Sequence, residues 1–399
     1  MRQSRPAPTA PPSHTWMPGA LLLLTAIFFL NFCSRVMMAP LMPRVEQSLN
    51  LSHAQAGSLF LLLSLGYFIS ILGSGLVAAR LTHRGNIILS ALGMAGALLA
   101  LSLAGGLGGL GAGLLVVGMA AGLYLPSGLA TLTSLVRPDH WGRAVAVHEL
   151  APNLGFVLAP LLAMGLLEVM SWRGVIAGLG LASLAGGLSF WRWGRGGGMA
   201  GQAPDLKSLR AILGLPGFWI MMLCFSLGLG ASLGIYNMLP LYLVSQHGYS
   251  PHKADLLVSA SRLSGVAMAF LAGWASDRLG PRTAMAWVLG LCGVLTLGLG
   301  LAQGGWLVAM LFLQPMLAVC FFPPGFAALG RLGGPPAARA NAVSLTVPLS
   351  FLLGGGALPA LIGFLGERLS FGWGIALAGA CMLLGPLFLR RLELVSPHQ

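Results

Sequence analysis

Four ionisable residues lie inside segments of the sequence that are otherwise strongly apolar: Arg35, His148, Glu149 and Arg262. A charged side chain near the middle of a bilayer costs at least about 2.5–3.5 kcal/mol, so such residues normally face a bundle interior or a water-filled cavity. Two guanidinium groups could hold an anion by bidentate hydrogen bonds. A carboxyl group beside an imidazole could exchange a proton near neutral pH. These residue types predict an anion site and a proton site.

The two arginines are expected at similar depths in the membrane. Arg35 precedes Arg44, at the outer end of its apolar segment, by nine residues, which is roughly 13 Å of helix. Arg262 follows His252 by ten residues, or roughly 15 Å. Both depths fall near the middle of a hydrocarbon core about 30 Å thick. Since the two arginines outnumber the one acid, we expect the cavity to bind an anion, with a small organic carboxylate favoured.

Polar and aromatic residues nearby could complete such a pocket. Asn31 lies one turn from Arg35 on the same helix face. Isolated polar residues more often serve in packing or in interhelical hydrogen bonds. Arg35 could likewise bond to backbone carbonyls, and Arg262 could pair with Asp255 two turns away. Besides Asn31, the residues expected to line the substrate pocket are Tyr124, Tyr236 and Asn237.

The acidic residue Glu149 is expected nearer the membrane edge than the arginines, because it lies six residues beyond Arg143, roughly 9 Å. Pro152 has no N–H, so the carbonyl of His148 loses its helical partner. We expect Glu149, with His148 as a second group, to couple proton movement to transport. The alternatives are an ion pair with a neighbouring basic residue for Glu149 and a position near the lipid headgroups for His148.

The composition identifies the solvent around these residues. The chain has 399 residues, 56% of them hydrophobic and only 8% charged, with a mean hydropathy of +0.85. Soluble domains carry about 25% charged residues, so polar residues are too scarce here to cover a water-soluble globule. The net charge of +13 comes from single basic residues between apolar runs, which argues against a nucleic-acid-binding surface. The five cysteines lack metal-ligand spacing.

Twelve apolar runs are long enough to cross a bilayer as helices of about 20 residues. Basic residues favour the loops on one side by sixteen to four, which predicts that this side and both termini are cytoplasmic. The first run is too long for a signal peptide and lacks a cleavage site. The runs lie near residues 16–40, 54–79, 85–104, 108–136, 144–168, 172–193, 216–246, 254–276, 283–302, 305–330, 340–365 and 371–390.

The runs divide into two related halves. The segment RAVAVHELAP (143–152) aligns with RANAVSLTVP (339–348), and GLVAARLTHR (75–84) aligns with GWASDRLGPR (273–282). Repeats of this kind place the substrate site of many transporters between the halves, near the bilayer midplane. The expected divisions are a cytoplasmic tail at 1–15, a first bundle at 16–193, a flexible Gly-rich linker at 194–215, a second bundle at 216–391 and a cytoplasmic tail at 392–399.

The segment GWASDRLGPR resembles the loop motif G-x-x-x-D-R-x-G-R-R of the major facilitator superfamily, which lies between the second and third spans of a half. The copy in the first half has Ala79 in place of the acid and Thr82 in place of the second glycine. The resemblance implies that Asp277 helps to close the cytoplasmic side by facing Arg143 at the start of the fifth span. The alternative is a local pair with a neighbouring arginine. The matching residues are Gly273, Asp277, Arg278, Gly280 and Arg282.

This resemblance implies an all-α integral membrane protein with twelve transmembrane helices in two pseudo-symmetric six-helix bundles. We expect a monomeric secondary transporter of the inner cell membrane that moves a small anion by alternating access with coupling to protons. No enzyme activity, cofactor or nucleic-acid partner is expected, because the sequence has no nucleotide-binding P-loop and the His-Glu pair lacks the second His of a zinc helix. A proton-driven exporter of drugs or metabolites and a non-transporting sensor are the alternatives.

Overall fold

The computed structural model describes residues 18–202, 206–332 and 336–395, so the expected tail at 1–15, residues 203–205 of the linker and residues 396–399 lie outside the described residues. The first bundle comprises α1 (Pro18–Val36), α2 (Met38–Leu49), α3 (His53–Ser102), α4 (Leu107–Gly122), α5 (Tyr124–Leu135), η1 (Pro138–His140), α6 (Trp141–Leu166) and α7 (Trp172–Trp193). A short helix, α8 (Leu206–Leu213), precedes the second bundle.

The second bundle contains more breaks within its spans than the first. Two of these breaks are π-helical, η2 and η4, and they return below because they supply carbonyl groups to the candidate site. The elements are α9 (Pro216–Leu229), η2 (Gly230–Gly234), α10 (Ile235–Ser245), α11 (Pro251–Arg262), α12 (Gly265–Leu279), α13 (Pro281–Leu301), α14 (Gly304–Ala318), η3 (Val319–Phe321), α15 (Phe322–Leu329), α16 (Pro336–Ser350), η4 (Phe351–Ala357), α17 (Leu358–Arg368) and α18 (Phe371–Leu389).

The described chain makes twelve spans, as the sequence predicted. Ten continuous helical stretches are long and apolar enough to cross a membrane. One of them, α3, has 50 residues and crosses twice, because it bends at Thr82. The pair α11 and α12, interrupted after Arg262, supplies the remaining span. The first span is longer than expected, since α2 continues it to Leu49, well past the predicted end at residue 40.

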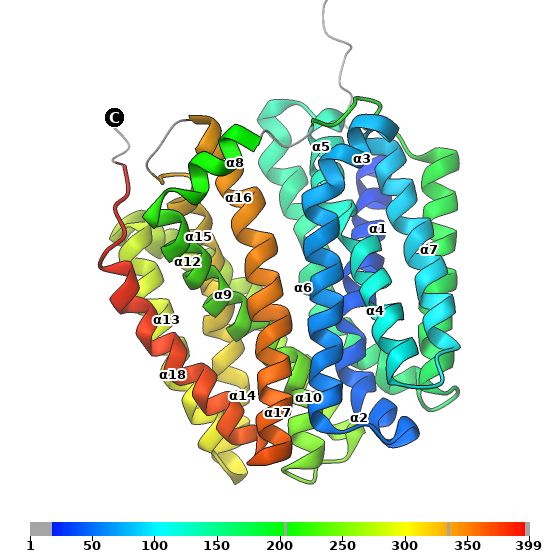
Figure 1. Cartoon of the computed structure of the whole chain (residues 1–399), viewed down its shortest axis with the longest axis vertical. Helices are drawn as coiled ribbons and strands as arrows, with labels where there is room; N and C mark the ends of the chain where they lie inside the picture. Colours follow the sequence, from blue (N-terminus) through cyan, green and yellow to red (C-terminus); the bar gives the residue numbers. More distant parts are fainter. Residues whose placement is uncertain (1–17, 203–205, 333–335, 396–399) are drawn as a thin grey trace, which may run out of the picture.

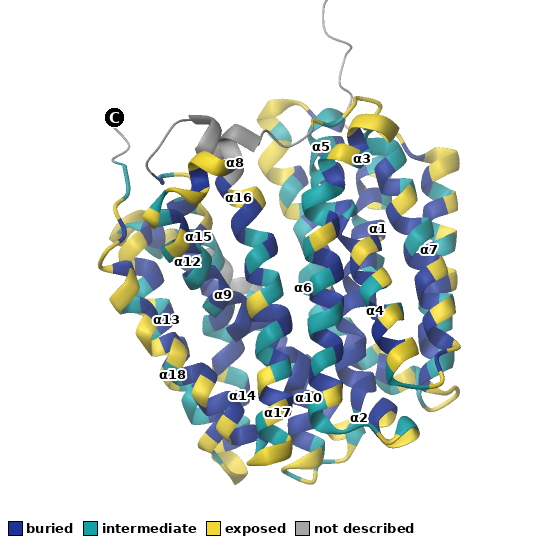
Figure 2. Cartoon of the chain, in the orientation of Figure 1, coloured by how far each residue is buried: buried dark blue, intermediate teal, exposed yellow. Residues whose placement is uncertain are grey.

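The outer surface of both bundles is apolar, and Figure 2 shows exposed residues along the outer sides of the helices. Trp191 and Trp193 end α7 at one end of the molecule, whereas Trp306 and Trp373 begin α14 and α18 at the other end. Each of these four indoles is at least 60% exposed. Tryptophan is enriched at the headgroup level of a bilayer. The four residues therefore mark the two membrane interfaces.

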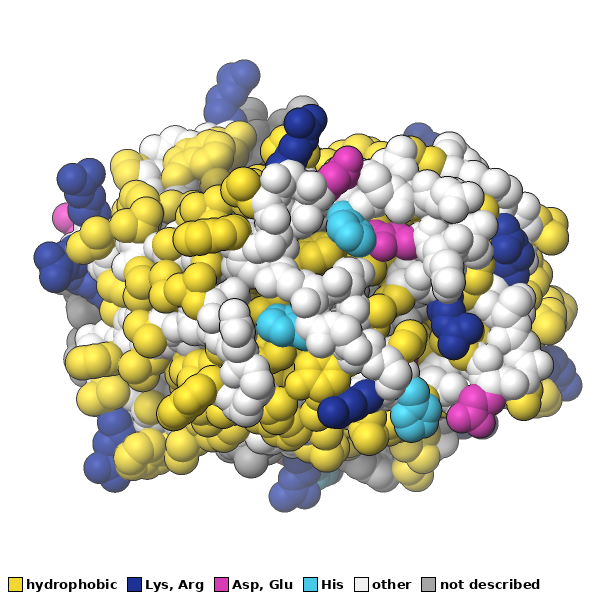
Figure 3. Space-filling view, turned by 90° about the horizontal axis from the view of Figure 1, so that it is seen from below, with side chains coloured by type: hydrophobic (Ala, Val, Ile, Leu, Met, Phe, Trp, Pro, Cys, Tyr) yellow, Lys and Arg dark blue, Asp and Glu magenta, His cyan; other side chains and the backbone are white. Residues whose placement is uncertain are grey.

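The two bundles pack closely against each other at one end of the molecule, which is the end opposite the linker. We call the end that carries the linker and the last turn of α18 the linker face, and the opposite end the far face (Figure 1). Toward the far face, α2, α3 and α6 of the first bundle pack against α10, α11 and α17 of the second. We refer to this contact as the far seam. Figure 3 shows the far face as a continuous surface across both bundles.

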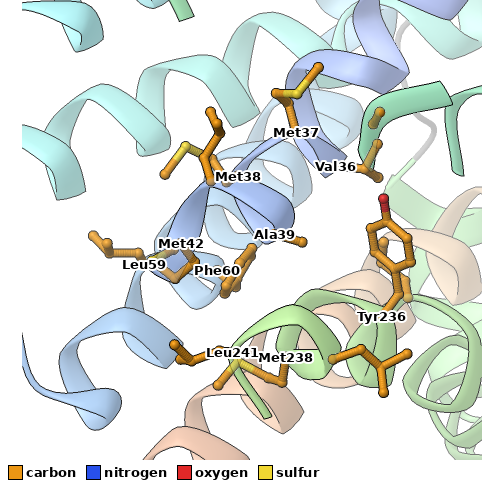
Figure 4. Packing of buried hydrophobic residues seen from close by; sticks show 14 of the residues in the cluster. Val36, Met37, Met38, Ala39, Met42, Leu59, Phe60, Tyr236, Met238 and Leu241 are labelled. Atoms are coloured by element: carbon orange, nitrogen blue, oxygen red, sulfur yellow. The ribbon is translucent and has the colours of Figure 1, made fainter. Parts of the chain in front are cut away.

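A single apolar cluster fills the far seam. Its buried residues come from both bundles, and Figure 4 shows Phe60 facing Leu241 and Met238, with Val36 beside Tyr236. Toward the linker face, each bundle instead buries its own separate cluster. The helix α16 stands apart from the first bundle toward the linker face, whereas its continuation α17 packs against α3 toward the far face (Figure 1). The two bundles therefore share one core at the far side and have separate cores toward the linker side.

The repeat seen in the sequence has a structural counterpart at the linker face. The guanidinium group of Arg84 donates hydrogen bonds to three backbone carbonyls at the end of α7. The aligned Arg282 donates to two backbone carbonyls just after α18, at 3.2 and 3.0 Å. The last carbonyls of a helix lack intrahelical partners and carry partial negative charge, so a basic side chain stabilises them. In each bundle, the arginine of the motif copy thus connects the loop after the second span to the end of the sixth span by hydrogen bonds.

The same loops share an unusual backbone conformation. Thr82 has φ 67° and ψ 165°, and the aligned Gly280 has φ 81° and ψ 147°. Residues with a Cβ rarely adopt this region. The start of the linker holds the Thr82 loop, because the backbone N–H of Arg84 donates to the carbonyl of Gly197 at 2.7 Å. This first part of the predicted linker is thus hydrogen-bonded to the first bundle.

Candidate functional site

The first predicted arginine, Arg35, lies near the end of α1, just before the helix is interrupted at Met37. It is only 7% exposed. Three aromatic rings surround its guanidinium carbon. Their centroids lie 5.0 Å away for Phe32, 4.6 Å for Tyr67 and 5.4 Å for Phe351. Phe351 belongs to η4 of the second bundle, so residues of both bundles bury this charge. Cation–π attraction partly replaces the hydration that the guanidinium has lost.

The second predicted arginine, Arg262, ends α11 and is only 8% exposed. Its guanidinium carbon lies 4.8 Å from the ring centroid of Phe156 and 5.0 Å from that of Tyr236. Phe156 comes from α6 of the first bundle, which mirrors the contact of Arg35 with Phe351. One Nη2 hydrogen bond, 2.8 Å long, goes to the carbonyl of Ser232. Each arginine therefore lies where the two bundles meet.

A continuous row of rings connects the two guanidinium groups. Phe32, beside Arg35, meets Phe156 edge to face with a centroid separation of 4.9 Å. Phe156, beside Arg262, meets Tyr236 in the same manner at 4.9 Å. Edge-to-face contact is a favourable arrangement of two aromatic rings. The aromatic residues thus hold both arginines in one site at the inner end of the far seam.

Two π-helical segments provide backbone acceptors beside this site. A π-helical turn widens the helix and frees carbonyls from their usual partners, and such turns are frequent at functional sites. In η2, the carbonyl of Ser232 accepts from Arg262, and that of Ala231 accepts from the Gln314 amide at 2.9 Å. In η4, the carbonyl of Gly355 accepts from Asn237 at 3.2 Å. The widened turns therefore position three polar side chains.

The positive charges of the site have no acidic partner. Within the described residues, the ion pairs join Glu46 with His53, Arg137 with Asp139 and His148 with Glu149. The predicted alternative, a pair between Arg262 and Asp255, is not among them. Four buried polar atoms of the site lack a hydrogen-bond partner, namely Nε of Arg35, Nε of Arg262, the Tyr236 hydroxyl and Oδ1 of Asn237. Three of these four groups can donate a hydrogen bond to an anion.

A small cavity opens beside Arg35, with room for about one water molecule. Its walls come from both bundles, as expected for a site between the repeats. Asn237, one of the predicted pocket residues, lies in this wall together with Tyr67 and Ser64. The complete lining consists of Phe32, Arg35, Val36, Leu63, Ser64, Tyr67, Leu233, Asn237 and Phe351.

Two of the predicted pocket residues lie elsewhere, inside the first bundle. The amide of Asn31 donates to the hydroxyl of Ser90 at 3.4 Å and to a backbone carbonyl of α4 at 3.3 Å. The hydroxyl of Tyr124 donates to the carbonyl of Leu24 at 2.8 Å. Each of these groups holds helices of one bundle together. The structure thus brings Arg35, Arg262, Tyr236 and Asn237 together but does not bring Asn31 or Tyr124 to them.

The predicted proton site is a compact group in the first bundle. His148 is fully buried and stacks on Phe28 at a centroid distance of 4.3 Å. Its Nε2 lies 3.1 Å from the Tyr124 hydroxyl. That hydroxyl has one hydrogen, which it donates to Leu24, so Nε2 of His148 must carry a hydrogen and donate to Tyr124. The neutral imidazole is therefore unprotonated at Nδ1.

The free Nδ1 of His148 points to the predicted acid. It lies 3.6 Å from Oε1 of Glu149, whose side chain is 46% exposed. A proton that reaches the half-exposed carboxylate can thus pass to a buried nitrogen with little movement. Asn153 does not compete for the carboxylate, because its amide donates to the backbone carbonyl of Glu149 at 2.8 Å. The geometry suits transfer of a proton between water and the interior of the bundle.

The predicted latch residues are separated in this conformation. Asp277 and Arg143 are both exposed at the linker face, and no ion pair joins them in the described part of the chain. The guanidinium carbon of Arg278 lies 5.1 Å from the ring of Trp274, next to Gly273 in α12. The predicted latch is therefore not formed in this conformation.

Sequence reasoning missed several residues that complete the site. Phe32, Phe156 and Phe351 surround the arginines, yet apolar rings are so common in membrane spans that nothing distinguished them. The sequence analysis also treated Glu149 as the only acidic residue of the apolar segments. In the structure Asp255, in α11, is buried as well, at 2% exposed. The spacing of seven residues between Asp255 and Arg262, which puts both on one helix face, was the available signal. Within the described residues, no group of three His, Cys, Asp or Glu side chains could hold a metal ion.

Comparisons with known proteins agree with this architecture. Residues 24–347 match the sequence profile of the Major Facilitator Superfamily. A structure of a bacterial homologue of the human lysosomal transporter Spinster, in an inward-facing and unoccupied conformation, superposes with a TM-score of 0.77 over 96% of both chains at 17% identity. A D-xylose-proton symporter superposes with a TM-score of 0.76 at 15% identity, over 96% of this chain and 98% of that one.

A short stretch of the chain also resembles a curated relative. It is 32% identical over 79 residues to a probable nitrate/nitrite transporter, NarK2, of Mycobacterium tuberculosis. The match spans 20% of this chain and 20% of that protein. At this coverage the likeness concerns a short part of the chain and does not extend to the whole relative.

Proposed function

Because the chain belongs to the Major Facilitator Superfamily, we propose that it moves a small anion across the membrane by alternating access, with coupling to protons. One observation carries this proposal. Two buried guanidinium groups, Arg35 and Arg262, lie between the bundles without an acidic partner. An uncompensated buried charge is costly, so a site of this kind gains most from a ligand of opposite charge.

The shape of the site favours a small, flat oxyanion. Guanidinium groups match the geometry of planar oxygen ligands, and aromatic faces can stack against them. A small organic carboxylate has this form. Nitrate and nitrite have it too, and the printed name of the NarK2 relative supports including them. A cationic substrate is disfavoured, because neither buried guanidinium has an acidic partner within the described residues that could bind a cation in its place.

The orientation follows from the basic residues. The linker face carries Arg84, Arg143, Arg278 and Arg282, whereas few basic residues lie in far-face loops. The positive-inside rule then makes the linker face cytoplasmic, with both termini inside the cell and the far face outside. In a bacterium, the inner membrane is the bilayer that this topology implies. The described conformation would then be closed toward the outside, where the far seam lies.

In alternating access, the two bundles move so that one face of the protein opens while the opposite face closes. The apolar far seam would part while the linker face closes, with the boundaries of the two moving bodies near 16–193 and 216–391. In that second conformation Asp277 would approach Arg143 at the start of α6. A charge at an inner helix end can also meet the positive N-terminus of the opposing helix. The proposed latch thus consists of Gly273, Asp277, Arg278, Gly280, Arg282 and Arg143.

Proton coupling is assigned to Glu149 and His148. The half-exposed side chain of Glu149 lies in the linker half of α6, where it would exchange protons with the cytoplasmic solution, and Nδ1 of His148 lies 3.6 Å from it. The imidazole stacks on Phe28, in the same helix as Arg35. A charge gained at His148 would therefore act on the helix that carries one of the two anion-binding groups. This connection is the physical basis for linking a proton to the substrate.

Uptake into proteoliposomes tests the function directly. The panel comprises small labelled carboxylates, nitrate and nitrite, each with and without an inward proton gradient. The proposal expects saturable uptake of at least one anion, faster when the outside is acidic. Absence of uptake for every anion, together with export of lipophilic cations by the same vesicles, would contradict the anion site. Equal uptake with and without the gradient would contradict proton coupling alone.

A further inference from the structure

One carboxyl group of the far seam, that of Asp255, has no ion-pair partner in the described part of the chain. Asp255, on the second turn of α11, is 2% exposed. The helices packed around α11 are α2, α6, α10 and α14. No ion pair reaches this carboxylate within the described residues. A burial this complete is unusual for an unpaired aspartate.

The contact between the bundles causes this burial. Asp255, Ser259 and Arg262 lie on one face of α11, at spacings of four and three residues. The Ser259 hydroxyl donates to the carbonyl of Val157, in α6 of the other bundle, at 2.7 Å. Arg262 lies against Phe156 of the same helix. This face of α11 therefore forms part of the far seam, and parting of the seam would bring water to Asp255.

The charged neighbours of Asp255 are few and come from identified helices. Arg44, on the exposed side of α2, is the basic residue whose charge acts on this carboxyl group, and Glu46 follows it on the same helix. The ionisable residues of α6, which are Arg143, His148 and Glu149, lie in its linker half. The helix α10 contributes Tyr236 and Tyr242, and α14 contributes none. On α11 itself, His252 and Lys253 precede Asp255 and Arg262 follows it.

Closing the seam over an ionised carboxylate would remove its hydration without providing an ion-pair partner, whereas closing it over a neutral acid is far less costly. We propose that Asp255 is a proton-binding site of the far seam and that the seam closes with a proton bound there. When the seam opens, the carboxyl group meets water near Arg44 and releases that proton to the far side. Closure of the far side thus consumes a proton from the far solution.

The equilibrium between the closed and the open far seam therefore depends on the binding of this one proton. Acid on the far side favours the closed seam, and alkaline solution favours the open one. Between the proton affinities of the two states, the ratio of closed to open molecules changes by up to about tenfold per pH unit. The inference rests on the alternating access of the proposed function, but not on the identity of the substrate. It assigns to the far side a proton step that is separate from Glu149 and His148.

Distances across the far face test this site. Spin labels on cysteines placed at Val169 and Leu369, in exposed far-face turns of the two bundles, report the opening of the seam. Cys381 is the one exposed cysteine of the described residues and is replaced by serine. We expect the long-distance population in nanodiscs to grow as pH rises through a window of about pH 5 to pH 8. A distribution that does not change with pH would overturn the proposal.

Substitutions separate Asp255 from other acids. Asp255→Asn should keep the seam closed at every pH, whereas Asp255→Glu should retain the pH response. The control Glu168→Gln removes an exposed acid of the far face and should behave as the parent protein. A pH response that persists in Asp255→Asn would overturn the proposal. Arg35→Ala should lose anion binding yet keep the pH-dependent distances, so failure of this inference and failure of the anion site are distinguishable.

Discussion

The guanidinium carbon of Arg262, in the second bundle, lies 4.8 Å from the ring centroid of Phe156, in the first. The contact joins the two moving parts through a residue that is also a candidate ligand for the substrate. Arg35 makes the reciprocal contact with Phe351, at 5.4 Å. Because both contacts cross between the bundles, binding at the arginines and movement of the bundles are expected to influence each other.

Replacing either arginine by lysine should weaken anion binding strongly. Lysine keeps the charge but loses the planar, bidentate donor geometry. A hydrogen bond to a charged group contributes about 1.5–3 kcal/mol, which corresponds to roughly 10- to 100-fold in affinity. Binding of radiolabelled anion to purified Arg35→Lys and Arg262→Lys proteins measures this loss. The control is Arg368→Lys, an exposed far-face arginine, and equal affinity in all three variants would argue against the site.

Removing the titrating groups should uncouple transport from protons. Glu149→Gln cannot carry a proton, and His148→Gln can still donate to Tyr124 but has no basic nitrogen. We expect both variants to exchange anion across vesicles at equilibrium while losing stimulation by an inward proton gradient. Gradient-driven uptake and exchange are measured on the same preparation. His252→Gln, an exposed histidine, serves as the control. Full gradient stimulation in Glu149→Gln would exclude its proton role.

The conformation of Thr82 should cost stability that glycine would restore. A residue with a Cβ at φ 67° and ψ 165° carries strain of about 1–3 kcal/mol. Part of the gain from Thr82→Gly is offset by the greater freedom of glycine in the unfolded chain, about 0.4–1 kcal/mol. Thermal unfolding in detergent should therefore occur a few degrees higher for Thr82→Gly. Gly280→Thr, the reverse change in the other bundle, should lower it, and a rise there would contradict the explanation.

A methyl group in the far seam should favour its opening. A Cβ added at Gly363 in α17 would collide with the backbone carbonyl of His53 in α3. Two packed backbones have little freedom to move apart locally, so the bundles are expected to separate. An impermeant thiol reagent should then label a cysteine at Ser64 faster from the far side in Gly363→Ala. Gly165→Ala is the matched control, because a Cβ there meets nothing within 4 Å. Equal labelling rates in both variants would refute this.

The sequence alone determined the number of spans and the internal repeat, and it predicted the depth of the arginines. Each of these depends on how single residues partition between lipid and water, which is a property of local sequence. Arg35 and Arg262 could be placed near mid-membrane by counting residues along a helix. The motif comparison even identified Thr82 as the departure from glycine, although its strained backbone could be seen only in the structure.

Only the tertiary structure decided which side chains meet across helices. The contacts of Arg35 with Phe351 and of Arg262 with Phe156 depend on how the helices rotate and pack, which hydropathy does not report. The same holds for Tyr124, which looked like a pocket residue but bonds within the first bundle to Leu24. The closed far seam, and with it the burial of Asp255, arises from contact between two bundles. Such a contact has no signature in either segment taken alone, because lipid and protein interiors are equally apolar to a helix.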